Sequence, residues 1–227
     1  MRVGVICSSG GAVFAAAMDL LRSCGYTPDA VVVTDRPCGA EKHCERLGIP
    51  WRRIEDPDRV NFSRKAAAWL YDEGGADWSC LFFSRLVSAE LYARVPCVNI
   101  HPSLLPAFPG FGAVSGALES RSRFIGATAH LADESTDAGG ILGQVIAPIP
   151  YGASVQLLER LSFAQKLYLF LVMHEFAERK ELVSLIGKDD EILGLHLLPW
   201  ASPALRNQRL ADHFDEFLEK EEIVWLR

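Results

Sequence analysis

The chain has 227 residues, of which 49% are hydrophobic and 23% charged, and its formal net charge is −6. This length predicts one large domain, or one domain with an appendage, whose core is large enough to fold without a disulfide or a metal. The composition excludes collagen, a coiled coil, a disordered tail and a membrane protein, and the acidic balance argues against a protein that grips a phosphate backbone.

Strand-length apolar runs alternate with helix-periodic segments in the first hundred residues. The predicted strands are Val3–Cys7, Ala30–Thr34, Trp51–Ile54, Trp78–Phe83 and Cys97–Ile100. The predicted helices are Ala12–Cys24, Glu41–Leu47 with Gly48 as its end, and a third from an N-cap at Asn61 to Tyr71, before Gly74 and Gly75. This alternation predicts an α/β fold: a Rossmann-like, mostly parallel twisted sheet with helices on both faces and ligands at the carboxyl ends of the strands.

The pattern changes after residue 100. The predicted elements there are a proline-rich loop, a helix over Ala113–Glu119, strands over Ile125–Leu131 and Ile141–Ile149, and a long helix from about Ala153 to Glu178. A last helix around Arg209–Glu221 presents Leu210, Phe214, Phe217 and Leu218 on one face and acids on the other. We predict a main domain of residues 1–180 and a C-terminal extension, residues 181–227, that packs on it or forms a dimer contact.

The cysteines and apolar segments indicate a reduced protein of the cytoplasm. None of the six cysteines forms a Cys-x-x-Cys pair, so we interpret them as structural thiols and predict no metal site. The stretch after Arg2 resembles a secretory leader, but Ser8–Gly11 interrupts it, and Asp19 and Arg22 follow. The run Leu167–Met173 is too short to span a bilayer. We therefore predict a cytoplasmic protein with no membrane partner.

Two polar residues stand at the end of the fifth predicted strand. Asn99 and His101 are two positions apart, so their side chains point to the same face, and Pro102 favours an extended backbone at His101. The amide can donate to a developing oxyanion and the imidazole can exchange a proton, which suits acyl transfer. Taken alone, a histidine before a proline is as often a turn residue bonded to the backbone.

A carboxylate lies further along the chain, in an acidic loop that Gly139 and Gly140 close. Paired glycines let a backbone approach a ligand closely. Asp137 could orient an imidazole there or accept a proton through water. Most acidic loops are solvated turns, so this residue is a weak signal by itself.

Together, two segments closely resemble the signature segments of the folate-dependent formyltransferases. They read VNIHPSLLPAFPGFGA and GATAHLADESTDAGGILGQVIAPI, and the resemblance continues through VTDRPCGAEKHCERLGIP and FFSRLVSAEL. It covers roughly residues 1–180 and is nearest to the short, single-domain glycinamide ribonucleotide formyltransferases of purine synthesis. The Asn-x-His-Pro-Ser-Leu-Leu-Pro string with a downstream Asp-x-Gly is its most specific part. The resemblance implies the formyltransferase fold, a 10-formyltetrahydrofolate co-substrate and no metal.

The resemblance also implies the roles of individual residues. Asn99 and His101 would stabilise the oxyanion of a tetrahedral intermediate, and Asp137 would hold His101 and help to carry a proton. The implied folate-binding residues are Arg64, near the glutamate tail, Ser84, Arg85, Leu86 and Val87, and the loop residues Asp133, Glu134, Ser135 and Thr136. The implied acceptor-binding residues are Gly10, Gly11, Ala12, Val13 and Gln165.

Two departures from the family fall on the acceptor side. The family's glycine loop ends in Gly-Ser-Asn, which holds the ribonucleotide phosphate, whereas this chain has Gly11-Ala12-Val13. The family's Glu-His pair on the long helix is here Gln165-Lys166. We therefore expect formyl transfer to a non-standard amine or hydroxylamine of a small molecule. Glycinamide ribonucleotide is the first alternative, and a folate-binding relic without activity is the second.

Other classes fit less well. The chain lacks the Gly-x-Gly-x-x-Gly of a dinucleotide oxidoreductase and the Gly-x-Ser-x-Gly of a hydrolase with Ser103 as nucleophile. A metal on His101, His130 and Asp137 lacks the spacing of a metalloprotease helix. The short acidic tail argues against a formyltransferase that acts on tRNA, so we expect no nucleic-acid partner. We expect a monomer or a homodimer.

Overall fold

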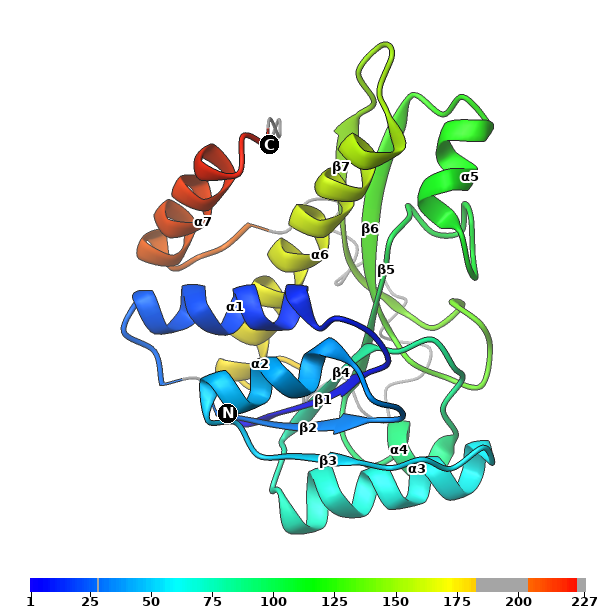
Figure 1. Ribbon diagram of the computed structural model, residues 1–227, viewed down its shortest axis with the longest axis vertical. Coiled ribbons are helices and arrows are strands. Elements are labelled where there is room, and N and C mark those ends of the chain that lie inside the picture. Colours follow the sequence, from blue (N-terminus) through cyan, green and yellow to red (C-terminus); the bar gives the residue numbers. More distant parts are fainter. Residues whose placement is uncertain (28, 183–203, 224–227) are drawn as a thin grey trace.

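The computed structural model describes residues 1–27, 29–182 and 204–223. A single seven-stranded sheet runs through the molecule in the order β3-β2-β1-β4-β5-β6-β7 (Figure 1). Its strands are β1 (Val3–Cys7), β2 (Ala30–Thr34), β3 (Trp51–Arg53), β4 (Trp78–Phe82), β5 (Cys97–His101), β6 (Phe124–Leu131) and β7 (Ile141–Pro148). The first five strands are parallel to one another. Strand β6 pairs antiparallel with β5, and β7 pairs antiparallel with β6. The predicted α/β class is confirmed.

Helices cover both faces of the sheet. On one face lie α1 (Ala12–Ser23), α2 (Gly39–Leu47) and α6 (Val155–Glu178). On the other lie α3 (Arg59–Ala67), its π-helical continuation η1 (Ala68–Glu73) and α4 (Ala89–Tyr92), at the bottom of Figure 1. Helix α5 (Ala113–Glu119) follows the proline-rich loop. The right-handed crossovers expected of parallel strands account for the two layers.

The central strand shows why these runs are apolar throughout. In β1, Val3, Val5 and Cys7 pack into the core beneath α1 and α6, while Ile6 packs into the separate core beneath α3. Successive residues of a strand point to opposite faces, and both faces of this strand are covered. Because β1, β2, β4 and β5 are parallel, their carboxyl ends lie at the same edge of the sheet.

The start of α3 corrects one prediction. The N-cap is Asp58, whose carboxylate accepts a hydrogen bond from the backbone N–H of Asn61 at 2.7 Å, so Asn61 lies inside the helix. Asp and Asn are both good N-cap residues, and the hydrogen bond identifies Asp58 as the cap. Gly48 ends α2 in the left-handed conformation, as predicted.

The C-terminal helix α7 (Gln208–Lys220) packs on the main body of the protein, beside α1 and α6 in Figure 1. The ring of Phe214 lies 5.1 Å from that of Tyr168, and the carboxylate of Glu175 accepts hydrogen bonds from the backbone N–H groups of Arg206 and Asn207. Residues 183–203 of the predicted extension lie outside the described residues. The predicted domain boundary and the dimer contact stay predictions.

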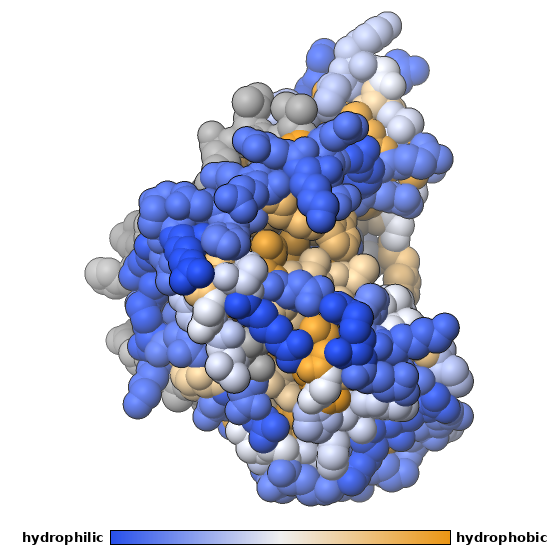
Figure 2. Space-filling view, turned by 60° about the vertical axis from the view of Figure 1, so that its left-hand side comes forward, coloured by the Kyte–Doolittle hydropathy of each residue, from blue (hydrophilic) through white to orange (hydrophobic). Residues whose placement is uncertain are grey.

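The face drawn in Figure 2 is mostly hydrophilic. Figure 2 shows the side that faces left in Figure 1, where apolar residues reach the surface in a hollow between two hydrophilic parts. Within the described ranges, no helix has both the length and the apolar character needed to cross a membrane.

Candidate active site

Four polar side chains converge at the carboxyl end of β5, and we call them the polar corner: Asn99, His101, His130 and Asp137. Antiparallel pairing of β5 with β6 sets Asn99 opposite His130. The amide nitrogen of Asn99 lies 3.1 Å from Nε2 of His130 and donates to Oδ1 of Asp137, also at 3.1 Å. The three residues predicted to be catalytic are thus brought together.

The loop between β6 and β7 places Asp137 at this corner. Asp137 itself adopts a left-handed backbone, with a φ of 53°. At Gly139 an added Cβ would lie 1.8 Å from the carbonyl oxygen of Leu131, so only glycine lets the loop return this close to the end of β6. Gly140 has open space around it. Of the two glycines, Gly139 is therefore the one that the position of Asp137 requires.

His101 is 5% exposed, and both of its ring nitrogens face oxygen atoms. Its Nε2 lies 2.8 Å from the carbonyl oxygen of Phe108, and its Nδ1 lies 3.2 Å from Oδ2 of Asp137. Each of these oxygens can only accept, so a ring nitrogen that carries a proton donates to it. The imidazole is therefore held between a backbone carbonyl group and the carboxylate of Asp137.

Asp137 is held ionised by its neighbours. Burial opposes the charge, but the side chain of His130, the backbone N–H of Gly110 at 2.8 Å and the imidazole of His101 outweigh it and hold the pKa of Asp137 below its usual 3.8. Hydrogen bonds to the charged form act in this direction. The carboxylate is thus a permanent acceptor at neutral pH.

His130 completes the corner, although from the sequence it is a candidate only as a metal ligand. Its Nδ1 lies 2.9 Å from the carbonyl oxygen of Leu131, and its Nε2 faces both Asn99 and Asp137. The available signal was the alternation of the predicted strand 125–131, which sets His130 on the same face as Thr128. Among the residues that the structure describes, no group of His, Cys, Asp and Glu has the arrangement of a metal site.

A second set of polar residues fastens the proline-rich loop to the antiparallel strands. The hydroxyl of Thr128 accepts from the backbone N–H of Leu105 at 3.0 Å and donates to the carbonyl oxygen of Ser103 at 2.7 Å. Gln144 of β7 donates from its amide to the carbonyl oxygen of Leu105 at 2.9 Å. These bonds fix the loop that carries the carbonyl group of Phe108 to His101.

The predicted folate segment Ser84–Val87 follows β4 and lies at the same edge as the polar corner. The backbone N–H of Ser84 donates to the hydroxyl of Ser8 at 3.2 Å. Leu86 is exposed, whereas the side chain of Val87 is buried in the core beneath α3. Leu86 can therefore offer its side chain to a ligand, and Val87 only its backbone.

The two predicted folate-binding arginines differ. Arg85 donates to the carbonyl oxygen of Pro57 at 2.9 Å and lies 3.7 Å from the carboxylate of Asp35, so its guanidinium is held in place. Arg64 of α3 has a 64% exposed side chain, 3.9 Å from the carboxylate of Glu90. Arg64 is the freer cation of the two.

The remaining predicted folate residues form the tip of the acidic loop. The backbone N–H of Ser135 donates to the carboxylate of Asp133 at 2.8 Å, and Glu134, Ser135 and Thr136 are exposed. Tyr92 of α4 lies near this loop: burial first, and then the negative charges of Glu134 and Asp133, raise the pKa of its hydroxyl. The loop is thus close to the elements that follow β4.

The predicted acceptor loop is packed against α2. An added Cβ at Gly11, where φ is 68°, would lie 2.7 Å from Cβ of Ala40, so the close approach requires glycine. Gly10 and Ala12 are exposed, whereas the side chain of Val13 is buried in the core. Backbone N–H groups at the start of α1 are the loop's remaining means of binding an anion.

Gln165 of α6 does not reach this loop with its side chain. It is completely buried and donates from its amide to the carbonyl oxygen of Ile125 at 3.2 Å. The structure therefore does not bring Gln165 to an acceptor. Its neighbour Lys166 is half-buried, and burial lowers the pKa of the ammonium group.

Comparisons with known proteins identify the family. The sequence model described as formyl transferase matches residues 1–172. The chain therefore belongs to the formyl transferase family, as predicted.

Individual relatives and solved structures show which members of the family this chain is similar to. The phosphoribosylglycinamide formyltransferase of Mycobacterium tuberculosis is 30% identical over 173 residues, which cover 73% of this chain and 80% of that protein. The human trifunctional purine biosynthetic protein adenosine-3 is 34% identical over 173 residues, and the chain spans only 17% of its length. Among solved structures, glycinamide ribonucleotide transformylase 1 of Symbiobacterium toebii has a TM-score of 0.68 and 32% identity, covering 75% of this chain and 84% of that one.

Proposed function

We propose that this chain transfers the formyl group of 10-formyltetrahydrofolate to the amine of glycinamide ribonucleotide. The observation that carries the proposal is the polar corner, where Asn99, His101 and Asp137 lie within hydrogen-bond distance at the carboxyl edge of the sheet. The departures in the predicted acceptor loop and at Gln165 favoured a different amine. Relatives of similar length that are named for phosphoribosylglycinamide support this acceptor better.

The reaction begins with attack of the acceptor nitrogen on the formyl carbon. A C–N bond forms, the carbonyl oxygen becomes an oxyanion, and Asn99 and His101 donate hydrogen bonds to it. Both donors are engaged before substrate arrives, the amide with Asp137 and the imidazole with the carbonyl oxygen of Phe108. For His101, the oxyanion replaces a neutral carbonyl acceptor, so this exchange favours the transition state.

Collapse of the intermediate then breaks the bond between the formyl carbon and the folate nitrogen. The proton lost by the attacking amine must reach that leaving nitrogen. Asp137 is ionised and hydrogen-bonded to His101, so it can accept the proton through water and pass it on. The products are the formamide and tetrahydrofolate, and no redox step occurs.

The folate would lie along the segment after β4 and the acidic loop. The exposed Leu86, the backbone of Val87 and the exposed tip of the loop, residues 134–136, are available for contact at this edge. Arg64 offers a partly free guanidinium to the carboxylates of the glutamate tail. No metal is required, because charge on the intermediate is met by donors.

A second candidate is formyl transfer to another small amine, and one observation favours it. The loop that would hold the acceptor's phosphate has the exposed Ala12 where the family has a hydroxyl, and Gln165 is buried away from the loop. An acceptor without a phosphate would not need those side chains. The donor side is common to both candidates.

The test is a formyl-transfer assay with 10-formyltetrahydrofolate, followed by the absorbance of the folate product. Turnover with glycinamide ribonucleotide at saturating donor is the expected result. Donor binding without turnover would favour the second candidate and lead to a screen of other amines. Failure of the donor itself to bind would overturn the folate assignment, and binding without transfer to any amine would leave a folate-binding relic.

A further inference from the structure

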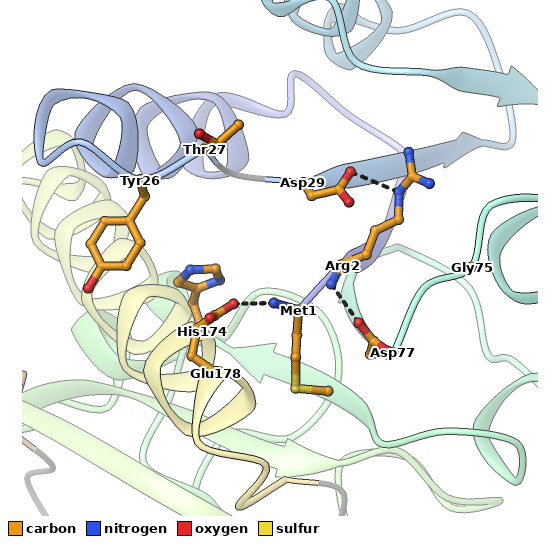
Figure 3. Close-up of a pocket in the computed structure, with 9 residues that line it drawn as sticks. All are labelled: Met1, Arg2, Tyr26, Thr27, Asp29, Gly75, Asp77, His174 and Glu178. Carbon is orange, nitrogen blue, oxygen red and sulfur yellow. Dashed lines mark hydrogen bonds and ion pairs between the residues drawn. The ribbon is translucent and has the colours of Figure 1, made fainter.

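The two edges of the sheet differ in the charges that they offer to a ligand. Figure 3 shows a cavity of about 490 Å³ at the amino edge, lined by the residues that precede β1, β2 and β4 and by His174 and Glu178 of α6. The guanidinium of Arg2 already pairs with Asp29 there, at 2.9 Å. The amino group of Met1 already pairs with Glu178. An anion at this edge would therefore meet cations that carboxylates have taken.

At the carboxyl edge, two guanidinium groups share one carboxylate. Asp35 is the first residue after β2, and its side chain is 2% exposed. Arg36 donates to it at two points, from Nε to Oδ1 at 3.0 Å and from Nη2 to Oδ2 at 2.7 Å. Nη1 of Arg85 lies 3.7 Å from the same Oδ2. We call these three residues the arginine cluster, and its cations outnumber its anion.

Arg36 is the open member of the arginine cluster. Its side chain is 51% exposed, against 26% for Arg85, which also donates to the carbonyl oxygen of Pro57. A guanidinium has several N–H donors in one fixed plane, and Asp35 engages only Nε and Nη2 of Arg36. The Nη1 group can therefore bind a ligand, while the two-point pairing already fixes the orientation of the side chain.

The arginine cluster adjoins the predicted acceptor loop. The hydroxyl of Ser8, directly after β1, hydrogen-bonds to Asp35. An added Cβ at Gly39 would lie 3.0 Å from the carbonyl oxygen of Gly10, so the segment after Arg36 packs closely on the loop. In doubly wound α/β folds, residues near the end of the second strand commonly contact a ligand held on the loop after the first. Arg36 is thus tied to the start of the acceptor loop through Asp35 and Ser8.

The loop itself has no charged side chain between Ser8 and Val13. A phosphate monoester carries a charge of about −1.5 to −2 at neutral pH. Backbone N–H groups at the start of α1 can bind its oxygen atoms, but they supply only a partial positive charge. Arginine is the side chain best matched to a phosphate group, because it offers two parallel, charge-assisted hydrogen bonds.

We propose that Arg36 binds the phosphate group of the formyl acceptor and so selects a phosphorylated amine over an uncharged one. The assignment rests on the proposed function, in which the acceptor carries a phosphate. Arg36 supplies the charge-assisted hydrogen bonds that the exposed Ala12 cannot. Because the phosphate is remote from the amine that reacts, this contact is made equally in the ground state and the transition state. It therefore lowers KM and leaves kcat unchanged.

The first measurement is the formyl-transfer assay with glycinamide ribonucleotide at saturating donor. Arg36→Met removes the cation and should raise KM for the acceptor by about tenfold or more. Neither kcat nor the KM of the folate donor should change. Arg36→Lys keeps one cation beside Asp35 but loses the planar fork, so an intermediate KM is expected. A rise in the donor KM alone would place Arg36 at the folate and overturn the proposal.

The second measurement separates the role of Arg36 from the identity of the reacting amine. Isothermal titration calorimetry of the full chain, without folate, should show saturable binding of ribose 5-phosphate, and Arg36→Met should weaken it by a similar factor. Ribose is the uncharged control, and its weaker binding should be the same in the variant. If glycinamide ribonucleotide gives no turnover but ribose 5-phosphate binding still depends on Arg36, the proposed function fails and the assignment of Arg36 stands for another phosphorylated amine.

Arg46→Met is the matched control. Arg46 lies in the last turn of α2, is also 51% exposed and also donates to one carboxylate at two points, that of Asp19 at 3.1 and 2.8 Å. Its KM and Kd should equal those of the wild type. The proposal is overturned if Arg36→Met leaves both values unchanged, if Arg46→Met changes them as much, or if the wild type does not bind ribose 5-phosphate.

Discussion

Two buried histidines at opposite edges of the sheet have different surroundings. At the carboxyl edge, His101 is 5% exposed and has an oxygen atom within 3.2 Å of each ring nitrogen. At the amino edge, His174 is 3% exposed and leaves Nδ1 without a partner among the described residues. The two histidines are therefore alike in burial and differ in their partners.

The difference lies in what each region is prepared to do. The polar corner is a closed network in which Asn99, His101 and Asp137 hold one another in place, so the side chains are positioned before the reaction begins. The amino edge leaves Nδ1 of His174 buried without a partner among the described residues, which costs stability. Changes at the first region should affect turnover, and changes at the second should affect stability.

Substitutions in the polar corner should lower turnover most strongly. His101→Ala and Asp137→Ala should each lower kcat by about 10³-fold or more, because proton transfer and charge stabilisation are lost together. Donor affinity should remain within several-fold of the wild type, since neither side chain is needed to hold the folate. Single-turnover kinetics and donor titration measure the two quantities.

His43→Ala on α2 is the matched control, a histidine outside the polar corner. Its turnover should equal that of the wild type. Unchanged turnover in either His101→Ala or Asp137→Ala would show that the network does not perform the chemistry.

Asn99→Ala should have the next largest effect. Removal of one oxyanion donor commonly lowers kcat by about 10²–10³-fold. The amide also donates to Asp137, so its loss should leave that carboxylate less firmly positioned. We expect the protein to remain folded. A fall in kcat without a matching rise in KM would support the oxyanion role. A change in KM alone would place Asn99 in binding instead.

Alanine substitutions at Gly139 and Gly140 test whether the position of Asp137 depends on the path of the loop. Gly139→Ala sets a methyl group against the carbonyl oxygen of Leu131, so the loop must move and carry Asp137 away from His101. We expect a loss of about tenfold or more in kcat/KM and a lower Tm. Gly140→Ala adds the same methyl group in open space and should change neither. Equal behaviour of the two variants would contradict the account of the loop.

A smaller effect is expected at the acceptor loop. Ala12 is exposed at the start of α1, so Ala12→Ser restores a hydroxyl group where a phosphate could reach it. For glycinamide ribonucleotide, kcat/KM should rise by about three- to tenfold, mainly through KM. Val13→Asn is the contrasting variant, because it buries a carboxamide in the core and should cost about 1–3 kcal/mol of stability. An unchanged KM in Ala12→Ser would remove the phosphate from this loop.

The last prediction concerns stability rather than turnover, namely its pH dependence at His174. Burial, and secondarily the amino group of Met1, lower the pKa of His174 from 6.5 to about 4, against the opposing charge of Glu178. Between these values the unfolded chain binds the proton and the folded one does not, so the free energy of unfolding should fall as pH drops, by at most about 3 kcal/mol. Urea titrations across this window should show a flatter profile for His174→Phe.

Asp137 supplies the contrasting window. Its pKa is lowered from 3.8, so its stabilisation is present above that value and is lost only as pH falls further. His174→Phe should leave formyl transfer at neutral pH unchanged. A loss of turnover in this variant would mean that the two edges are coupled.

The strands were predictable because a strand buried on both faces is apolar along nearly its whole length. The buried run Ala30–Thr34 is apolar along nearly its whole length, and its observed bounds match the prediction. The start of α3 was missed by three residues because Asp58 and Asn61 are both capable caps, and only the hydrogen bond distinguishes them. Short α4 and the π-helical turn η1 have no periodic pattern long enough to predict.

For the site, local spacing was enough to bring out Asn99 and His101, which share one strand. Their partners come from residues distant in sequence: Asp137 depends on the close return of the loop at Gly139, and His130 depends on antiparallel register with β5. Gln165 was matched to a family position, but its burial against β6 follows from packing and not from residue type.

Residue types at short, regular spacings were enough to predict the family, the α/β class and the groups that we propose to react. Which groups are paired, buried or left open depends on the other elements packed against them, so the tertiary structure was needed to establish it. His101 and His174 are the same residue type at similar burial. Their different partners are set by loops and strands that no local pattern connects.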